Sequence, residues 1–203
     1  MRKGVKRILI CFFLTCFFWC GTLVADRQRL YEELIRLHVV ANSDSETDQV
    51  IKLRVRDAVI ISLREAMENV ADVEEAKKWL QDNLMVIQNI ANEALRDTGS
   101  SDRAIVSLCK EVFDTRYYDT FTLPAGIYNA LRITIGEGDG KNWWCVVFPS
   151  LCVPATVDGF EAAAASAGFP DTLNDTLTGK QGYEVRFFLL DALGRLENIF
   201  FEE

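Results

Sequence analysis

The chain has 203 residues, of which 49% are hydrophobic, and its formal charge is −8 at pH 7. This length suits one globular domain of ordinary size with a terminal appendage. The negative charge repels nucleic acids and anionic lipid surfaces, so neither is expected as a partner. The chain has a single histidine and no paired Cys or His spacing, which argues against a zinc-type metal site.

The N-terminal appendage is an apolar run from Ile8 to Ala25 that contains no charge. Four basic residues precede it: Arg2, Lys3, Lys6 and Arg7. About 18 apolar residues behind a basic end are typical of either a secretory signal or a membrane anchor. By the positive-inside rule, the four basic residues stay in the cytoplasm, so the rest of the chain is expected to be exported. We therefore expect a signal peptide or membrane anchor at 1–25 and a single exported domain at 26–203, with 18 basic against 30 acidic residues, a net charge of −12.

The exported part opens with a short polar joint at 26–29 and a predicted strand at 34–41. Residues 42–45 form a turn and cap cluster. Apolar residues at helical spacing then predict an amphipathic helix over 46–69 and a second helix from Asp72 to Gly99. Two such helices with a short joint are expected to form an antiparallel pair packed on a sheet.

Alternating apolar residues predict the strands of that sheet at 103–113 and 127–135, with a short extended piece at 120–123. The glycine-rich segment 136–140 then separates the second strand from an aromatic and β-branched run at 143–148. Strand, glycine-rich turn and strand is the pattern of a β-hairpin. Within the last strand, the adjacent Trp143 and Trp144 must point to opposite faces of the sheet.

The composition shifts after Pro154. Residues 156–168 predict a short helix and 171–182 a polar loop, so that 156–182 as a whole is expected to be rich in loops or poorly ordered. A strand or helix start at 183–190 leads into a predicted closing helix at 191–200. The expected fold class is α+β: an antiparallel helix pair packed on a mostly antiparallel sheet, preceded by an N-terminal signal or transmembrane segment.

Few residues point to catalysis. The one histidine, His38, lies within the first predicted strand, where a lone histidine is more often structural than catalytic. The segment 136–140 carries two acids and opens a strand, whereas a phosphate loop opens a helix, so a turn is the better interpretation. No catalytic residue and no cofactor are expected. Cys145 and Cys152 are the favoured disulfide pair, with free thiols as the alternative.

Two blocks of the sequence resemble the stage II sporulation protein R family. The first is IRLHVVANSDSETDQVIKLRVRDAV at 35–59, and the second is LPAGIYNALRITIGEGDGKNWWCVVFPSLC at 123–152. They come in the family's order behind an apolar N-terminal segment, and the match spans about residues 30–155. The string NWWCVVFP is its most specific part.

The resemblance implies a signal and not an enzyme. Members of the family are made in the forespore of endospore-forming bacteria and exported into the space between forespore and mother cell. There they trigger a membrane aspartic protease, stage II sporulation protein GA, which processes the pro-sigma-E factor. Two alternatives stay open, an exported cell-wall hydrolase that uses acids and His38, and a membrane-tethered structural module of the spore envelope. The matched blocks supply the candidate partner-binding residues, which mix contact and fold-keeping positions: Arg36, Asn42, Asp44, Arg56, Asp57, Arg132, Asn142, Trp143 and Trp144.

Overall fold

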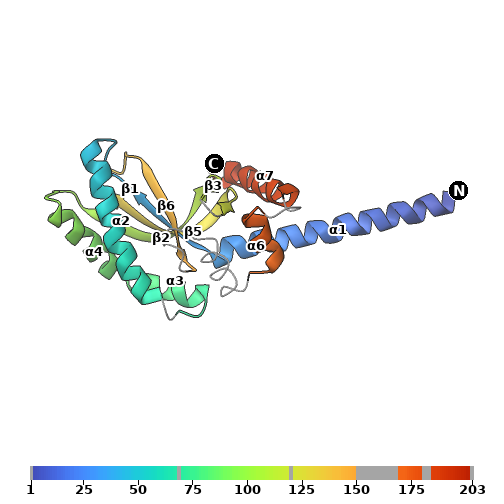
Figure 1. Ribbon diagram of the computed structural model, residues 1–203, viewed down its shortest axis with the longest axis horizontal. Coiled ribbons are helices and arrows are strands. Elements are labelled where there is room, and N and C mark those ends of the chain that lie inside the picture. Colours follow the sequence, from blue (N-terminus) through green and yellow to red (C-terminus); the bar gives the residue numbers. More distant parts are fainter. Residues whose placement is uncertain (1, 68–69, 119–120, 150–168, 180–183, 202–203) are drawn as a thin grey trace.

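The computed structural model describes residues 2–67, 70–118, 121–149, 169–179 and 184–201. A long helix, α1, projects from a body that the other elements form (Figure 1). The elements in chain order are α1 (Arg2–Glu33), β1 (Ile35–Val40), α2 (Glu46–Met67), α3 (Val73–Asp82), α4 (Leu84–Asp97), β2 (Ala104–Phe113), β3 (Arg116–Tyr117), β4 (Thr122–Leu123), β5 (Gly126–Ile135), β6 (Asn142–Phe148), α6 (Asp171–Leu177) and α7 (Glu184–Phe201).

The central sheet has the strand order β2-β5-β1-β6, and β3 and β4 form a separate pair. β1 pairs in parallel with β5 and antiparallel with β6, while β2 and β5 are antiparallel. All six residues of β1 are buried, as expected for a central strand that is covered on both faces. The helices and this mostly antiparallel sheet confirm the predicted α+β class.

The predicted hairpin between 127–135 and 143–148 is wrong, because β1 lies between these two strands. Both strands exist, but the segment that joins them crosses the end of β1. The amide of Gly140 donates to the carbonyl of Ala41 at 2.9 Å, and that of Asp139 to the carbonyl of Asn42 at 3.1 Å. Alternation assigns each residue to a face of the sheet, but it does not say which strand lies alongside.

Helices α2, α3 and α4 cover one face of the sheet, which we call the first face. The helix predicted from Asp72 to Gly99 is in fact two, since the chain breaks at Asn83, whose side-chain amide donates to the carbonyl of Trp79 at 2.8 Å. Asp72, the predicted start of this helix, caps α3 and accepts from the amide of Glu75 at 2.9 Å. The Glu75 carboxylate in turn accepts from the amide of Ala71, the residue before the cap.

The opposite face, the second face, is covered by the C-terminal end of α1, by α6 and α7, and by the β3–β4 pair. Residues 26–29, expected as a polar joint, continue α1 as helix, with Leu23 and Leu30 buried in this second core. Residues 171–177, expected as a polar loop, form α6, because Leu173 and Leu177 are buried one helical turn apart. The short helix predicted at 156–168 lies outside the described residues.

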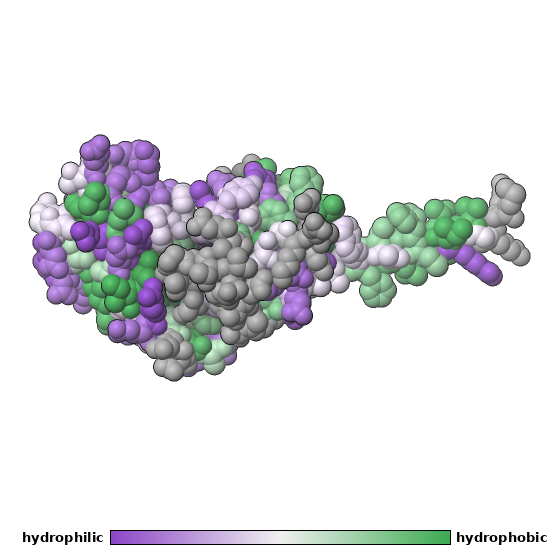
Figure 2. All heavy atoms as spheres, viewed as in Figure 1, coloured by the Kyte–Doolittle hydropathy of each residue, from purple (hydrophilic) through white to green (hydrophobic). Residues whose placement is uncertain are grey.

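The N-terminal part of α1 is long and apolar enough to cross a membrane, by length and composition. Its large hydrophobic side chains are exposed, and they cover the projecting part of the helix (Figure 2). Because such a surface is costly in water, this part of α1 is suited to a bilayer. A signal peptide and a membrane anchor share this property.

Candidate functional site

A cluster of polar and aromatic side chains from four strands gathers on the second face of the sheet. Strand register brings its members together, because His38 lies opposite Arg132 on one side and opposite Trp144 on the other. Residues two apart in a strand share a face, so Asn142 joins the side of Trp144. Glu111 reaches the same place from β2. We call these five residues the His38 cluster: His38, Glu111, Arg132, Asn142 and Trp144.

Hydrogen bonds connect the members of the cluster. Nδ1 of His38 lies 2.9 Å from both carboxylate oxygens of Glu111, and Nε2 lies 2.9 Å from Oδ1 of Asn142. The guanidinium of Arg132 donates to Glu111 at 2.7 Å. The indole ring of Trp144 stacks on the imidazole with the ring centroids 5.5 Å apart. The polar groups and the rings therefore hold one another in a defined arrangement.

The charges in the cluster keep Glu111 ionised. Burial alone raises the pKa of this carboxyl, but the hydrogen bonds and charges of His38 and Arg132 outweigh burial and hold the pKa below its ordinary value. Cys109, next along β2 on the same face, shows the opposite effect. Burial, together with the charge of Glu111, raises the pKa of its thiol and disfavours the reactive thiolate.

In this arrangement His38 is not placed to act as a general base. Both ring nitrogens of His38 already have hydrogen-bond partners, so neither is free to take a proton from a nucleophile. Within the described ranges, no group of three or more His, Cys, Asp or Glu residues is placed to hold a metal ion. What the cluster can do is present fixed donors and acceptors to another molecule.

The outer edge of the cluster is accessible and carries positive charge. The side chain of Arg132 is 40% exposed, whereas those of His38 and Glu111 are 8% and 16% exposed. Asn142 is exposed as well. A second guanidinium, that of Arg116, lies 3.5 Å from the ring centroid of Trp144. His38 and Glu111, which are largely covered, thus support an exposed, cationic edge on an otherwise acidic protein.

Arg36, another candidate residue, lies on the same face of β1 but is fully buried. Its guanidinium carbon is 3.9 Å from the ring centroid of Phe113 and 4.9 Å from that of Tyr128. It also donates to the hydroxyl of Tyr118 at 3.2 Å. Arg36 therefore belongs to the second core and offers no surface to a partner in this conformation.

Asn42 and Asp44 hold the segment that crosses the end of β1. The side-chain oxygen of Asn42 accepts from the amide of Glu137 at 3.0 Å, and the carboxylate of Asp44 accepts from the amide of Lys141 at 2.7 Å. Gly136 has φ of +59°, and a Cβ there would lie 2.2 Å from Oδ1 of Asn42. The backbone amides that would have to bind an anion therefore already donate to oxygens of the protein. This agrees with a turn and not with a phosphate loop.

The remaining candidates lie on the other side of the sheet. Trp143 packs against the first core, whereas Trp144 packs against the second, so the two indoles face opposite ways as predicted. The guanidinium of Arg56 on α2 lies 4.7 Å from the Trp143 ring centroid, and it forms an ion pair with Asp57 at 2.6 Å. Each tryptophan is therefore partly covered by an arginine of this chain.

The structure thus divides the nine candidates among four places, and three of them, Arg132, Asn142 and Trp144, belong to the His38 cluster. Sequence reasoning missed Glu111 altogether. Its position in the sequence could have indicated it, because the alternation of β2 places Glu111 on the opposite face from Val106 and Leu108. Cys145 is disulfide-bonded, while Cys152, its favoured partner, lies outside the described residues.

Comparison with known proteins places the cluster within a matched region. A family model described as stage II sporulation protein R matches residues 31–158, a range that contains all five residues of the His38 cluster. The stage II sporulation protein R of Bacillus subtilis (strain 168) is 34% identical over 183 residues, which cover 81% of this chain and 82% of that protein. No solved structure matches the chain.

Proposed function

Because the chain belongs to the stage II sporulation protein R family, we propose that it is an exported intercellular signal of endospore formation. It leaves the forespore by means of its N-terminal apolar helix and acts in the space between forespore and mother cell. Its target is the membrane aspartic protease stage II sporulation protein GA, which then processes pro-sigma-E. The chain itself acts as a binding partner and not as an enzyme.

The His38 cluster is the observation that supports this proposal most. Arg132 is held by a 2.7 Å hydrogen bond to Glu111, which His38 holds in turn. A side chain that is already fixed loses little conformational entropy on binding, so more of its interaction energy contributes to affinity. A guanidinium favours carboxylates and carbonyl oxygens, which a protease surface in the intermembrane space can offer.

Activation follows if the protease binds this chain more tightly in its active arrangement than in its inactive one. A ligand shifts an equilibrium between two states only by its difference in affinity for them. A tenfold preference corresponds to about 1.4 kcal/mol, which one well-placed arginine can supply. The exposed edge of the His38 cluster is therefore the surface that we assign to the protease.

Substitution of Arg132 tests this assignment. The full chain, the protease and pro-sigma-E are produced together in a host that does not sporulate, and the processed fraction is followed over time by immunoblot. We expect Arg132→Ala to slow processing about tenfold, as the loss of about 1.4 kcal/mol of binding energy would do. Arg54→Ala, which removes an exposed arginine of α2 on the other side of the sheet, should leave the rate unchanged.

The two possible failures can be told apart. If the wild-type chain produces no processing, the proposed function is wrong. If the wild-type chain is active and Arg132→Ala, shown to be folded by its thermal unfolding, is equally active, the function stands but the His38 cluster does not carry it.

A further inference from the structure

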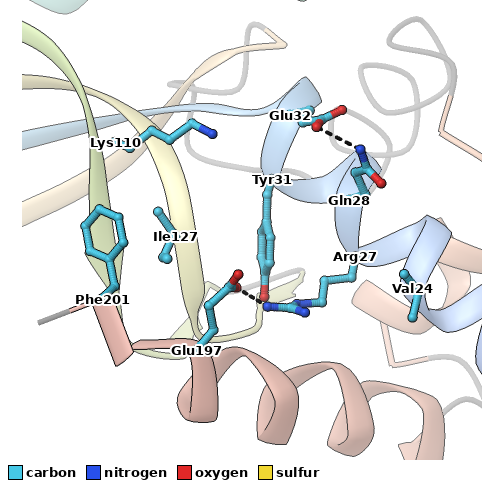
Figure 3. Close-up of a pocket in the computed structure, with 9 residues that line it drawn as sticks. All are labelled: Val24, Arg27, Gln28, Tyr31, Glu32, Lys110, Ile127, Glu197 and Phe201. Carbon is cyan, nitrogen blue, oxygen red and sulfur yellow. Dashed lines mark hydrogen bonds and ion pairs between the residues drawn. The ribbon is translucent and has the colours of Figure 1, made fainter. Parts of the chain in front are cut away.

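A cavity of about 320 Å³ lies where α1 enters the body (Figure 3). Helix α1 forms one side of it, the strands β2 and β5 form another, and the C-terminal end of α7 closes it. Val24 of α1 and Phe201 of α7 give it apolar walls, and charged side chains from all three sides point inward. Its volume falls at the lower end of the range for small-molecule sites.

The position of this cavity along α1 relates it to a membrane. The apolar run ends at Ala25, and the lining begins at Val24 and ends at Glu32. Eight residues of α-helix rise about 12 Å. The polar headgroup layer on each side of a bilayer is roughly 5–8 Å thick. If α1 spans the bilayer with its apolar run, the cavity therefore begins inside the headgroup layer.

The cavity is held in this position by the fold. Leu23 and Leu30 of α1 are buried in the second core, so the helix cannot swing freely relative to the body. Two ion pairs join α1 to α7, Asp26 with Arg186 and Arg27 with Glu197. The junction is thus formed before any lipid is bound, which lowers the entropic cost of binding one.

The charged groups of the lining are balanced in sign. Arg27 and Lys110 supply two cations, and Glu32 and Glu197 supply two carboxylates. The side chain of Gln28 donates to Glu32 at 3.0 Å, and Arg27 is paired with Glu197. Lys110 is exposed and points toward the cavity (Figure 3). A lining without net charge favours a ligand that carries both signs over a simple anion or cation.

We propose that this cavity binds the headgroup of a phosphatidylethanolamine molecule of the membrane that α1 spans. The phosphate lies toward Lys110, and the ammonium group donates to Glu32, at the end of the cavity where these two side chains lie (Figure 3). The acyl chains continue past Val24 along the apolar run of α1. Such a lipid fixes the orientation of the body relative to the bilayer and makes that orientation depend on lipid composition. This inference is independent of the proposed target protease.

Native mass spectrometry of the full chain in nanodiscs tests the proposal. The chain is released from nanodiscs of phosphatidylglycerol that contain one-third phosphatidylethanolamine. We expect one phosphatidylethanolamine molecule to stay bound to the released chain. With phosphatidylcholine of the same acyl chains in its place, retention should fall about tenfold, because methyl groups replace the N–H groups that donate hydrogen bonds to Glu32.

Two variants identify the cavity as the site. Lys110→Ala, on an exposed position of β2, should reduce retention of phosphatidylethanolamine about tenfold, while Lys78→Ala, an exposed lysine of α3, should not change it. Glu32→Gln should remove the preference for phosphatidylethanolamine over phosphatidylglycerol. Equal retention of the choline lipid, a preference for phosphatidylglycerol by the wild-type chain, or full retention by Lys110→Ala would each overturn the proposal.

Discussion

At the scale of single residues, Glu111 shows how a charge can be kept inside a sheet. Its carboxylate accepts hydrogen bonds from His38 at 2.9 Å and from Arg132 at 2.7 Å, and its side chain is only 16% exposed. An ion without partners at such a place would cost several kcal/mol. Here two donors compensate for the lost hydration, so the charge can serve to position Arg132.

Glu111→Gln is expected to lower the free energy of unfolding by about 1–3 kcal/mol at neutral pH, because two donors lose an ionised acceptor. Burial raises the pKa of Glu111, but His38 and Arg132 together hold it below the ordinary value of 4.5. The contribution of the carboxylate is therefore complete above the pKa of the unfolded chain and is lost as the pH falls through the lower, folded pKa. In urea unfolding, the difference between the two proteins should narrow below about pH 4.5.

The control for this experiment is Glu93→Gln, which changes an exposed carboxylate of α4. It should leave the free energy of unfolding within about 0.5 kcal/mol of the wild-type value, both at neutral pH and below about pH 4.5. A Glu111→Gln deficit that stayed constant from pH 7 to pH 3 would contradict the assigned role of this carboxylate.

At the scale of elements, α7 approaches the segment before β5 so closely that a side chain would not fit between them. A Cβ on Gly194 would lie 1.6 Å from the carbonyl oxygen of Ala125. Beside this contact, the carboxylate of Asp191 accepts from the amide of Ala125 at 2.8 Å. Glycine is thus required here by proximity to the backbone, and Asp191 fixes the register of the helix against it.

Gly194→Ala is expected to destabilise the protein by about 1–3 kcal/mol, because the helix must move away from a backbone atom that has no room to yield. This loss should exceed the gain of about 1 kcal/mol that alanine gives in a helix interior. Hydrogen exchange should show faster opening of α7, and the urea midpoint should fall. Leu196→Ala, at a position 55% exposed on the same helix, should change neither the hydrogen exchange of α7 nor the urea midpoint by much. A variant with alanine at 194 that is more stable than the wild type would refute this account.

At the scale of the whole molecule, α1 serves two environments along one continuous helix. Its N-terminal part carries exposed apolar side chains, such as Leu14 at 53% exposure. Its C-terminal part buries Leu23 and Leu30 in the second core beside α6 and α7. The same helix is therefore both a candidate membrane segment and a structural part of the body.

Two leucine substitutions separate these roles. Leu30→Ala should lower the stability of the body by about 2–5 kcal/mol, because it leaves a cavity in the second core. Leu14→Ala should not change the stability of the body, since its side chain touches nothing there. Thermal unfolding of both full-length variants in the same detergent compares them directly. Equal transition temperatures would mean that the body folds without support from α1.

Much of the fold could be predicted from local pattern. The period of two in β2 and β5 assigns their faces, and the spacing of Val55, Val59 and Leu63 specifies the buried side of α2. Asp72 marks the start of α3. Pattern could not find the break at Asn83, because the apolar stripe continues through it, and it missed α6, whose two buried leucines stand among polar residues.

By itself, the sequence determined the α+β class, the family, the apolar N-terminal segment and the opposite orientations of Trp143 and Trp144, since these depend on neighbours along the chain. Only the tertiary structure decided that β1 lies between β5 and β6. That order brings His38, Glu111 and Arg132 within hydrogen-bond distance, although 73 residues separate His38 from Glu111. Strand order depends on the burial of the whole sheet between two helical layers, and no local period encodes it.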